Sequence, residues 1–263
     1  ALRSGAVAYI NVDTGVQGGE FTGGATPALA EFLREVTKAV PDPVTGKPLH
    51  DAWASRFDER VPRVNTIVGA TDYTAFQEYL GVSCIDMYFD GPYGVYHSQY
   101  DNYFRQSTIV DRDFAIGIGL AQLWGTLAWR LAEIPVLPMR YSDYARATAG
   151  YIDSAEAHAG SDRPIKLLAT RAAAARWEAA AIRLENRLAH GPVAPAVARA
   201  VNDKLMQVER ALVEPTGQHG RPFIRHLLVA PQPSYRSAYL PRIWDAIDRN
   251  DRGAVPAHEA EVV

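Results

Sequence analysis

The order of apolar segments in the first half of the chain is the feature that most constrains its fold. Short apolar runs at 5–13, 64–69 and 83–89 alternate with segments of helical periodicity, and a long apolar helix is predicted over 114–131. Alternation of this kind favours a largely parallel sheet covered by helices. The stretch between the first strand and the helix that begins at Pro27 is rich in Gly and Thr, so we expect a loop there.

The composition changes near residue 140, where a proline-containing linker is followed by almost continuous helical periodicity. A helix is predicted over 142–160, with Ser142 as its N-cap, because a hydroxyl at that position can accept a bond from the first turn. Two further helices are predicted over 164–191 and 195–213. The second half therefore reads as a separate, mostly helical part.

Bulk properties exclude several classes of protein. The 263 residues carry a net charge of −3, so no basic surface indicates nucleic-acid binding. The single cysteine, Cys84, cannot form an internal disulfide and reads as a small buried hydrophobe. The apolar run 114–131 contains Gln122 and Arg130, and its uncharged part is shorter than the ~20 residues of a membrane span, so we expect a buried core helix.

Two side chains are candidates for metal binding. Asp13 ends the first predicted strand, and sites in open α/β sheets form outside the carboxyl ends of strands. His97 lies between Tyr96 and Ser98 in the Gly- and Pro-rich segment 91–103, and histidine is a frequent metal ligand. A histidine beside tyrosines is more often a hydrogen-bonded loop residue, so the residues by themselves leave both interpretations open.

Six segments of the chain resemble, in the same order, the zinc exopeptidase family of glutamate carboxypeptidase II and the transferrin receptor. They are 8–13, 69–82, 91–103, 136–145, 202–215 and 221–231. The resemblance implies an α/β fold: the C-terminal part of a mixed, largely parallel-sheet zinc-peptidase sandwich, followed by an α-helical dimerisation domain. We expect a partial zinc peptidase domain at 1–138 and a transferrin-receptor-like helical dimerisation domain at 139–263.

The resemblance also implies roles for particular residues. Asp13 matches a ligand of one of two zinc ions, and His97 matches a ligand of the other. Tyr96 matches a tyrosine that lines the substrate pocket, where it could hydrogen-bond the developing oxyanion. Asp72 and Tyr235 lie in segments that the family uses near the same pocket. In the family, two zinc ions activate a water molecule and a glutamate accepts its proton.

The chain departs from the family pattern in two ways. The remaining zinc ligands and the glutamate base lie upstream of the strand at 8–13 in the family, so we expect the chain to be a piece of a longer protein. Catalytic zinc needs about three protein ligands, so we expect weak or absent zinc binding and no peptidase activity from this chain alone. Where the family enzyme has cations that read acidic substrates, this chain has Gly23, Asp86, Tyr88 and Ser234, which favours neutral or mixed peptides.

Several alternatives stay open at this point. The intact protein can be an aminopeptidase or a carboxypeptidase, or a non-catalytic, transferrin-receptor-like protein that dimerises and binds a partner. The 263-residue chain can also be the natural form of the protein, with a helical part that acts as an association module. The partners that we expect are a peptide substrate and a second copy bound through the C-terminal helices, with no nucleic acid. His226 reads as a structural hydrogen-bonding residue.

Overall fold

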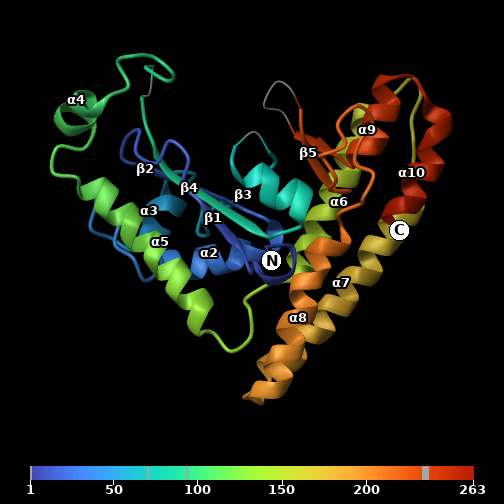
Figure 1. The fold of residues 1–263 in the computed structure, drawn as a ribbon, viewed down its shortest axis with the longest axis horizontal. Coiled ribbons are helices and arrows are strands. Elements are labelled where there is room, and N and C mark those ends of the chain that lie inside the picture. Colours follow the sequence, from blue (N-terminus) through green and yellow to red (C-terminus); the bar gives the residue numbers. More distant parts are fainter. Residues whose placement is uncertain (1, 70, 93, 233–236) are drawn as a thin grey trace. The chain divides into compact units, whose positions relative to one another are not determined.

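The computed structural model describes residues 2–69, 71–92, 94–232 and 237–263, and it divides into two compact units (Figure 1). The sheet unit comprises Ile10–Ile67 and Ile85–Ile134. The helical unit comprises Ala1–Tyr9, Val68–Cys84 and Pro135–Val263. The predicted combination of a mixed sheet with a mostly helical part is confirmed. The domain boundary between residues 138 and 139 stays a prediction.

The main sheet has the strand order β1-β4-β2-β3 within the described residues. Its strands are β1 (Tyr9–Asn11), β2 (Glu20–Ala25), β3 (Asn65–Thr66) and β4 (Cys84–Asp90). Strand β2 is antiparallel to β4 and parallel to β3, so the sheet is mixed. The elements around it are the 3-10 turn η1 (Pro27–Leu29) and the helices α2 (Ala30–Thr37), α3 (Leu49–Ser55), α4 (Tyr103–Arg105) and α5 (Ala115–Glu133), with the π-helical turn η3 (Gln106–Val110) between α4 and α5.

The expected loop before Pro27 is wrong, because most of its second half forms strand β2 at the centre of the sheet. Its glycines are required by packing. A Cβ added to Gly23 would lie 2.9 Å from the Trp53 ring, and one added to Gly24 would lie 2.6 Å from the Ile67 side chain. Glycine here therefore marks a place where neighbouring side chains approach the strand closely, and not a turn.

The core of the sheet unit lies between β2, β4 and the helices α2 and α3. Leu33 and Val36 of α2 are fully buried, in keeping with their helical spacing in the sequence. Trp53 of α3 is 1% exposed and packs edge-on against Phe21 of β2, with ring centroids 5.0 Å apart. Phe21 also contacts Phe89 of β4, so one aromatic cluster joins two strands and a helix.

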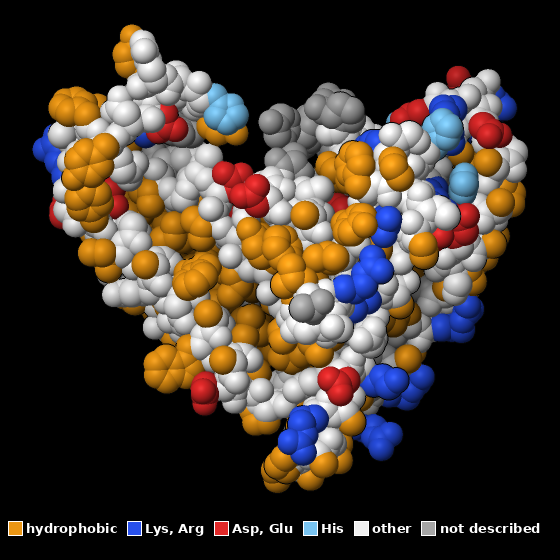
Figure 2. Space-filling view, viewed as in Figure 1, with side chains coloured by type: hydrophobic (Ala, Val, Ile, Leu, Met, Phe, Trp, Pro, Cys, Tyr) orange, Lys and Arg blue, Asp and Glu red, His pale blue; other side chains and the backbone are white. Residues whose placement is uncertain are grey.

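Helix α5 forms as predicted, but it is not a fully buried core helix. Leu120, Leu123 and Leu127 face the core, whereas Trp124 and Trp129 on the opposite face are 47% and 72% exposed. Figure 2 shows hydrophobic side chains along the edge where α5 lies. The composition of the helix is apolar all round, and only the tertiary structure shows that a single face is covered. Among the described residues, no helix has the length and apolarity to cross a membrane.

Three long helices run side by side in the helical unit: α6 (Tyr141–His158), α7 (Leu168–Ala189) and α8 (Pro195–Ala211) (Figure 1). The Tyr141 hydroxyl at the start of α6 donates to the Leu205 carbonyl of α8 at 2.7 Å, which ties the two helices together. The other elements are α1 (Leu2–Gly5), the π-helical turn η2 (Ala75–Leu80), the hairpin strands β5 (Val229–Pro231) and β6 (Ser237–Tyr239), α9 (Pro241–Asp248), the turn η4 (Arg252–Ala254) and α10 (Val255–Val262).

Carboxylates from neighbouring helices accept hydrogen bonds from backbone N–H groups at the N-terminal ends of α6 and α7. Ser142 is not the N-cap of α6. It lies in the first turn, where its backbone N–H and its hydroxyl both donate to Glu185 of α7, at 3.0 and 2.6 Å. Glu259 of α10 accepts in the same way from the backbone N–H groups of Ala169 and Thr170 at the start of α7. Acidic groups are favourable at helix N-termini, and these two also fix the packing of the bundle.

Candidate functional site

Asp13 lies just beyond the end of β1, as predicted, in an exposed turn of the sheet unit. Thr14 follows it with a positive φ of 48°, which turns the backbone. The chain then runs parallel to β4: Phe89 donates its N–H to the Gly15 carbonyl at 2.8 Å, and the Gln17 N–H donates to the Phe89 carbonyl at 2.8 Å. Asp13 therefore lies in a loop that is pinned to β4 on its C-terminal side.

The sequence interpretation placed Asp86 at a substrate-selecting position but did not identify its pairing with Asn11 of β1. The Asn11 side chain is 4% exposed and donates to Asp86 Oδ1 at 2.9 Å. Burial, together with the charge of Asp13, raises the pKa of Asp86 to about 6, although the hydrogen bond from Asn11 lowers it. The structure thus brings Asp13 and Asp86 close enough for their charges to interact. The signal in the sequence was a polar side chain inside each of two apolar strands.

His97 occupies an exposed loop after β4, where it adopts a left-handed backbone conformation with φ of 58°. Its ring stacks on Tyr96, with centroids 3.8 Å apart and planes 20° from parallel. A turn follows, in which the Ser98 N–H donates to the Val95 carbonyl at 3.0 Å. Tyr96 itself is 49% exposed.

The other two predicted site residues belong to the helical unit or lie outside the description. Asp72 is exposed in the turn that precedes η2. In η2, Gln77 and Glu78 are buried whereas Tyr79 is 38% exposed. Tyr235 lies outside the described residues.

A complete metal site needs about three donor side chains in one place. Nowhere in 2–69, 71–92, 94–232 or 237–263 do three or more His, Cys, Asp or Glu side chains come together in a group that could hold a metal ion. Asp13 and His97 therefore do not form a metal site with a third such side chain from the described part of the chain. The assignment of Asp13 and His97 as zinc ligands stays a prediction.

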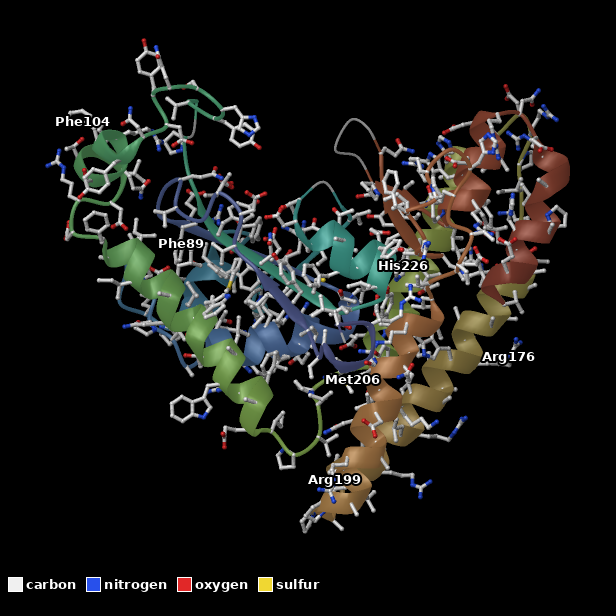
Figure 3. The ribbon with its side chains drawn as sticks, in the orientation of Figure 1. Phe89, Phe104, Arg176, Arg199, Met206 and His226 are labelled. Carbon is white, nitrogen blue, oxygen red and sulfur yellow. The ribbon has the colours of Figure 1, made fainter. Side chains whose placement is uncertain are left out.

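A buried polar cluster lies in the helical unit, where Figure 3 shows His226 close to the long helices. Glu209 Oε1 of α8 is 3.0 Å from His226 Nε2 and accepts from the Tyr144 hydroxyl of α6 at 3.1 Å. His226 Nδ1 accepts from the backbone N–H groups of Leu228 and Val229, so its proton lies on Nε2 and points to Glu209. The prediction that His226 is a structural hydrogen-bonding residue is confirmed.

Glu78 of η2 is a second buried carboxyl group in the helical unit. Neither of its carboxyl oxygens has a hydrogen-bond partner in the part of the chain that the structure describes. Burial and the charge of Glu209 raise the pKa of Glu78 well above its ordinary value, which favours the neutral acid. Burial and the same Glu209 charge also raise the pKa of Tyr144. These groups are enclosed by α6, α8 and the 221–231 segment, so we interpret the cluster as structural.

Comparison with known proteins places the chain in a family. Residues 165–263 match the model of the transferrin receptor-like dimerisation domain. The chain is 33% identical over 261 residues to a probable glutamate carboxypeptidase, VP8, of Zea mays, with 95% of this chain and 36% of the relative covered. It is 32% identical to the probable glutamate carboxypeptidase AMP1 of Arabidopsis thaliana, with 98% and 38% covered.

The match extends to proteins named as aminopeptidases. The chain is 28% identical to the aminopeptidase NAALADL1 of Mus musculus, with 88% of this chain and 34% of the relative covered. The chain thus spans roughly a third of the length of each of these curated relatives. The matched dimerisation domain and the similarity along nearly the whole chain agree with the six segments identified in the sequence. The chain belongs to the family of glutamate carboxypeptidase II and the transferrin receptor.

Proposed function

We propose that this chain is part of a dizinc exopeptidase, in which Asp13 binds one zinc ion and His97 binds the other. The proposal rests on the strands that precede these two side chains. Asp13 follows β1 and His97 follows β4, and these strands are neighbours in the sheet. The printed names of the relatives, glutamate carboxypeptidases and an aminopeptidase, support a peptidase.

The remaining ligands and the general base are expected from sequence outside this chain, because the described residues hold no group of three donors. The chain alone should therefore bind zinc weakly and hydrolyse no peptide. Calorimetric titration of the 263-residue chain with zinc tests the first point. Tight binding of two zinc ions by this chain would show that the ligand assignment is incomplete.

Tyr96 is the proposed catalytic residue of this chain, with a hydroxyl that donates to the developing oxyanion. Asp72, Tyr96 and Tyr235 are the proposed substrate-binding residues. In the longer protein that contains this chain, Tyr96→Phe should lower kcat by about 10²–10³-fold, as loss of one oxyanion donor does in other enzymes. Tyr100→Phe is the matched control, because Tyr100 lies in the same loop and is 66% exposed. An unchanged kcat for Tyr96→Phe removes this role.

The proposed substrates are neutral or mixed peptides. Asp86 and the half-buried Tyr88 lie in β4, where the resemblance places cations that select acidic substrates. An acidic side chain and a phenol give no attraction for a substrate carboxylate. The longer protein should therefore show a higher kcat/KM for peptides with neutral side chains than for acidic dipeptides. A preference for acidic dipeptides would contradict this assignment.

We also propose that the chain forms a homodimer through the helices α7 and α8. An apolar groove of about 680 Å³ lies between them, with Trp177, Leu184, Val197 and Leu205 in its lining. Val197 is 53% exposed and Leu184 is 39% exposed. The groove lies within the residues that match the dimerisation domain, which supports a second copy of the chain as its occupant.

The oligomeric state tests this second proposal. Val197→Arg places a charge at the exposed rim of the groove, so light scattering after gel filtration should show a monomer where the unchanged protein is a dimer. Ala175→Arg is the control, because Ala175 is exposed on α7 and does not line the groove. A dimer that persists in Val197→Arg, or a monomeric unchanged protein, would contradict the proposal.

A further inference from the structure

A second cavity, of about 300 Å³, lies in the helical unit and is lined by three arginines, Arg3, Arg210 and Arg225. Gln207 and Ser4 add polar groups to its wall. Apart from these, its lining is aliphatic, and no acidic side chain contributes to it. A cavity of this size corresponds to roughly ten water molecules at liquid density, so it can hold a small organic anion.

Arg210 supplies the most buried cation of this cavity. Its Nη2 donates to the Ala6 carbonyl at 2.9 Å, which fixes the direction of the guanidinium group. Its Nε and Nη1 atoms are buried and have no hydrogen-bond partner among the described residues. Burial lowers the pKa of Arg210, but an arginine keeps its charge in proteins. Buried donors are nearly always paired, and the described residues supply no acceptor for these two atoms.

The described contacts that hold Arg225 in place do not include a carboxylate. Its guanidinium carbon lies 4.0 Å from the centroid of the Tyr79 ring, and its Nε donates to the Pro222 carbonyl at 3.2 Å. Within the described residues, neither Arg3 nor Arg210 nor Arg225 forms a salt bridge, whereas Arg146 of α6 and Arg171 of α7 both do. The cavity thus gathers three positive charges that no acidic side chain of the described chain balances.

The backbone around Arg210 is tightly fixed. Gly81, which ends η2, has a positive φ of 66°, and a Cβ at this position would lie 2.7 Å from the Arg210 Cα. Glycine therefore allows η2 to approach α8 closely, and Leu80 beside it lines the cavity. The cation is held by a rigid frame, so little entropy is lost when it binds a ligand.

We propose that this cavity binds a phosphate group. Guanidinium groups match phosphate oxygens in pairs of parallel hydrogen bonds, and a phosphate carries about two negative charges, whereas a carboxylate carries one. The shared chemistry fits inorganic phosphate or a small phosphate monoester, and the volume leaves room for the organic part of a monoester. The site does not depend on the proposed peptidase activity, because it involves neither Asp13 nor His97.

Isothermal titration calorimetry on the 263-residue chain tests the proposal, with sodium phosphate and glycerol 3-phosphate as ligands at a constant ionic strength set by sodium chloride. We expect one phosphate per chain. Arg3→Gln and Arg225→Gln should each weaken binding about tenfold or more, because each removes charged hydrogen-bond donors. Arg210→Gln should abolish binding, and circular dichroism checks that this variant folds.

Arg199→Gln is the matched control. Arg199 is exposed near the N-terminal end of α8, as Figure 3 shows, so the variant loses the same charge from the same helix outside the cavity. Tighter binding of glycerol 3-phosphate supports an organic phosphate as the ligand, and equal binding supports inorganic phosphate. Absence of heat with both ligands overturns the proposal, as does an equal loss of affinity in Arg199→Gln and Arg225→Gln.

Discussion

Gly24→Ala is the substitution that most directly tests how β2 is packed. A Cβ at this position would lie 2.6 Å from Ile67 Cγ2 and 3.1 Å from the Asn65 carbonyl oxygen, both well inside van der Waals contact. Overpacking of this kind costs about 1–3 kcal/mol. Alanine recovers about 0.5–1 kcal/mol because it restricts the unfolded chain more than glycine does. The free energy of unfolding should therefore fall, by up to about 2.5 kcal/mol.

The same substitution in α5 should have the opposite effect. Gly125 is exposed, and a Cβ there would have nothing within 4 Å, so Gly125→Ala removes only the cost of glycine in a helix. It should raise the free energy of unfolding by about 0.8–1 kcal/mol. Urea titration followed by circular dichroism measures both changes. If Gly24→Ala is neutral or stabilising, the close approach of Ile67 to β2 is wrong, and the reasoning about this strand is refuted.

Three other substitutions follow from the same structure. The folded-state pKa of Asp86, about 6, lies above its ordinary value of 3.8, so only the folded protein holds this proton between those values. The free energy of unfolding should therefore fall by up to about 3 kcal/mol as the pH rises from about 4 to 6. Asp86→Asn should remove this pH dependence, which urea titrations at each pH measure. If the variant keeps the same pH dependence, the burial of Asp86 is contradicted. Trp53→Ala should lower the free energy of unfolding by about 3–5 kcal/mol, because it removes the ring that packs against Phe21. A loss under about 1 kcal/mol in the same assay would mean that Trp53 is not a core residue. Tyr144→Phe should lower the free energy of unfolding by about 1–3 kcal/mol, because the buried Glu209 carboxylate loses a hydrogen-bond donor. Thermal melting measures this loss. An unchanged melting temperature would argue against the hydrogen bond between Tyr144 and Glu209.

The family and most of the element order were determined by the sequence alone. The apolar face of α2, the core position of Trp53, the strand β4 and the long helices all follow from residue spacing, because periodicity depends only on local backbone geometry. The six family-like segments led to the family, and the comparisons support that assignment.

The packing of distant segments was decided only by the tertiary structure. Strand β2 looked like a loop, because nothing local tells a glycine that turns the chain from one that Trp53 or Ile67 approaches closely. The one-sided burial of α5 and the helix-capping carboxylates depend likewise on elements far away in sequence. The Asn11–Asp86 pair and the arginine cavity have the same physical origin. In both, the polar side chains come from segments far apart in the sequence, so no single segment could predict their contact.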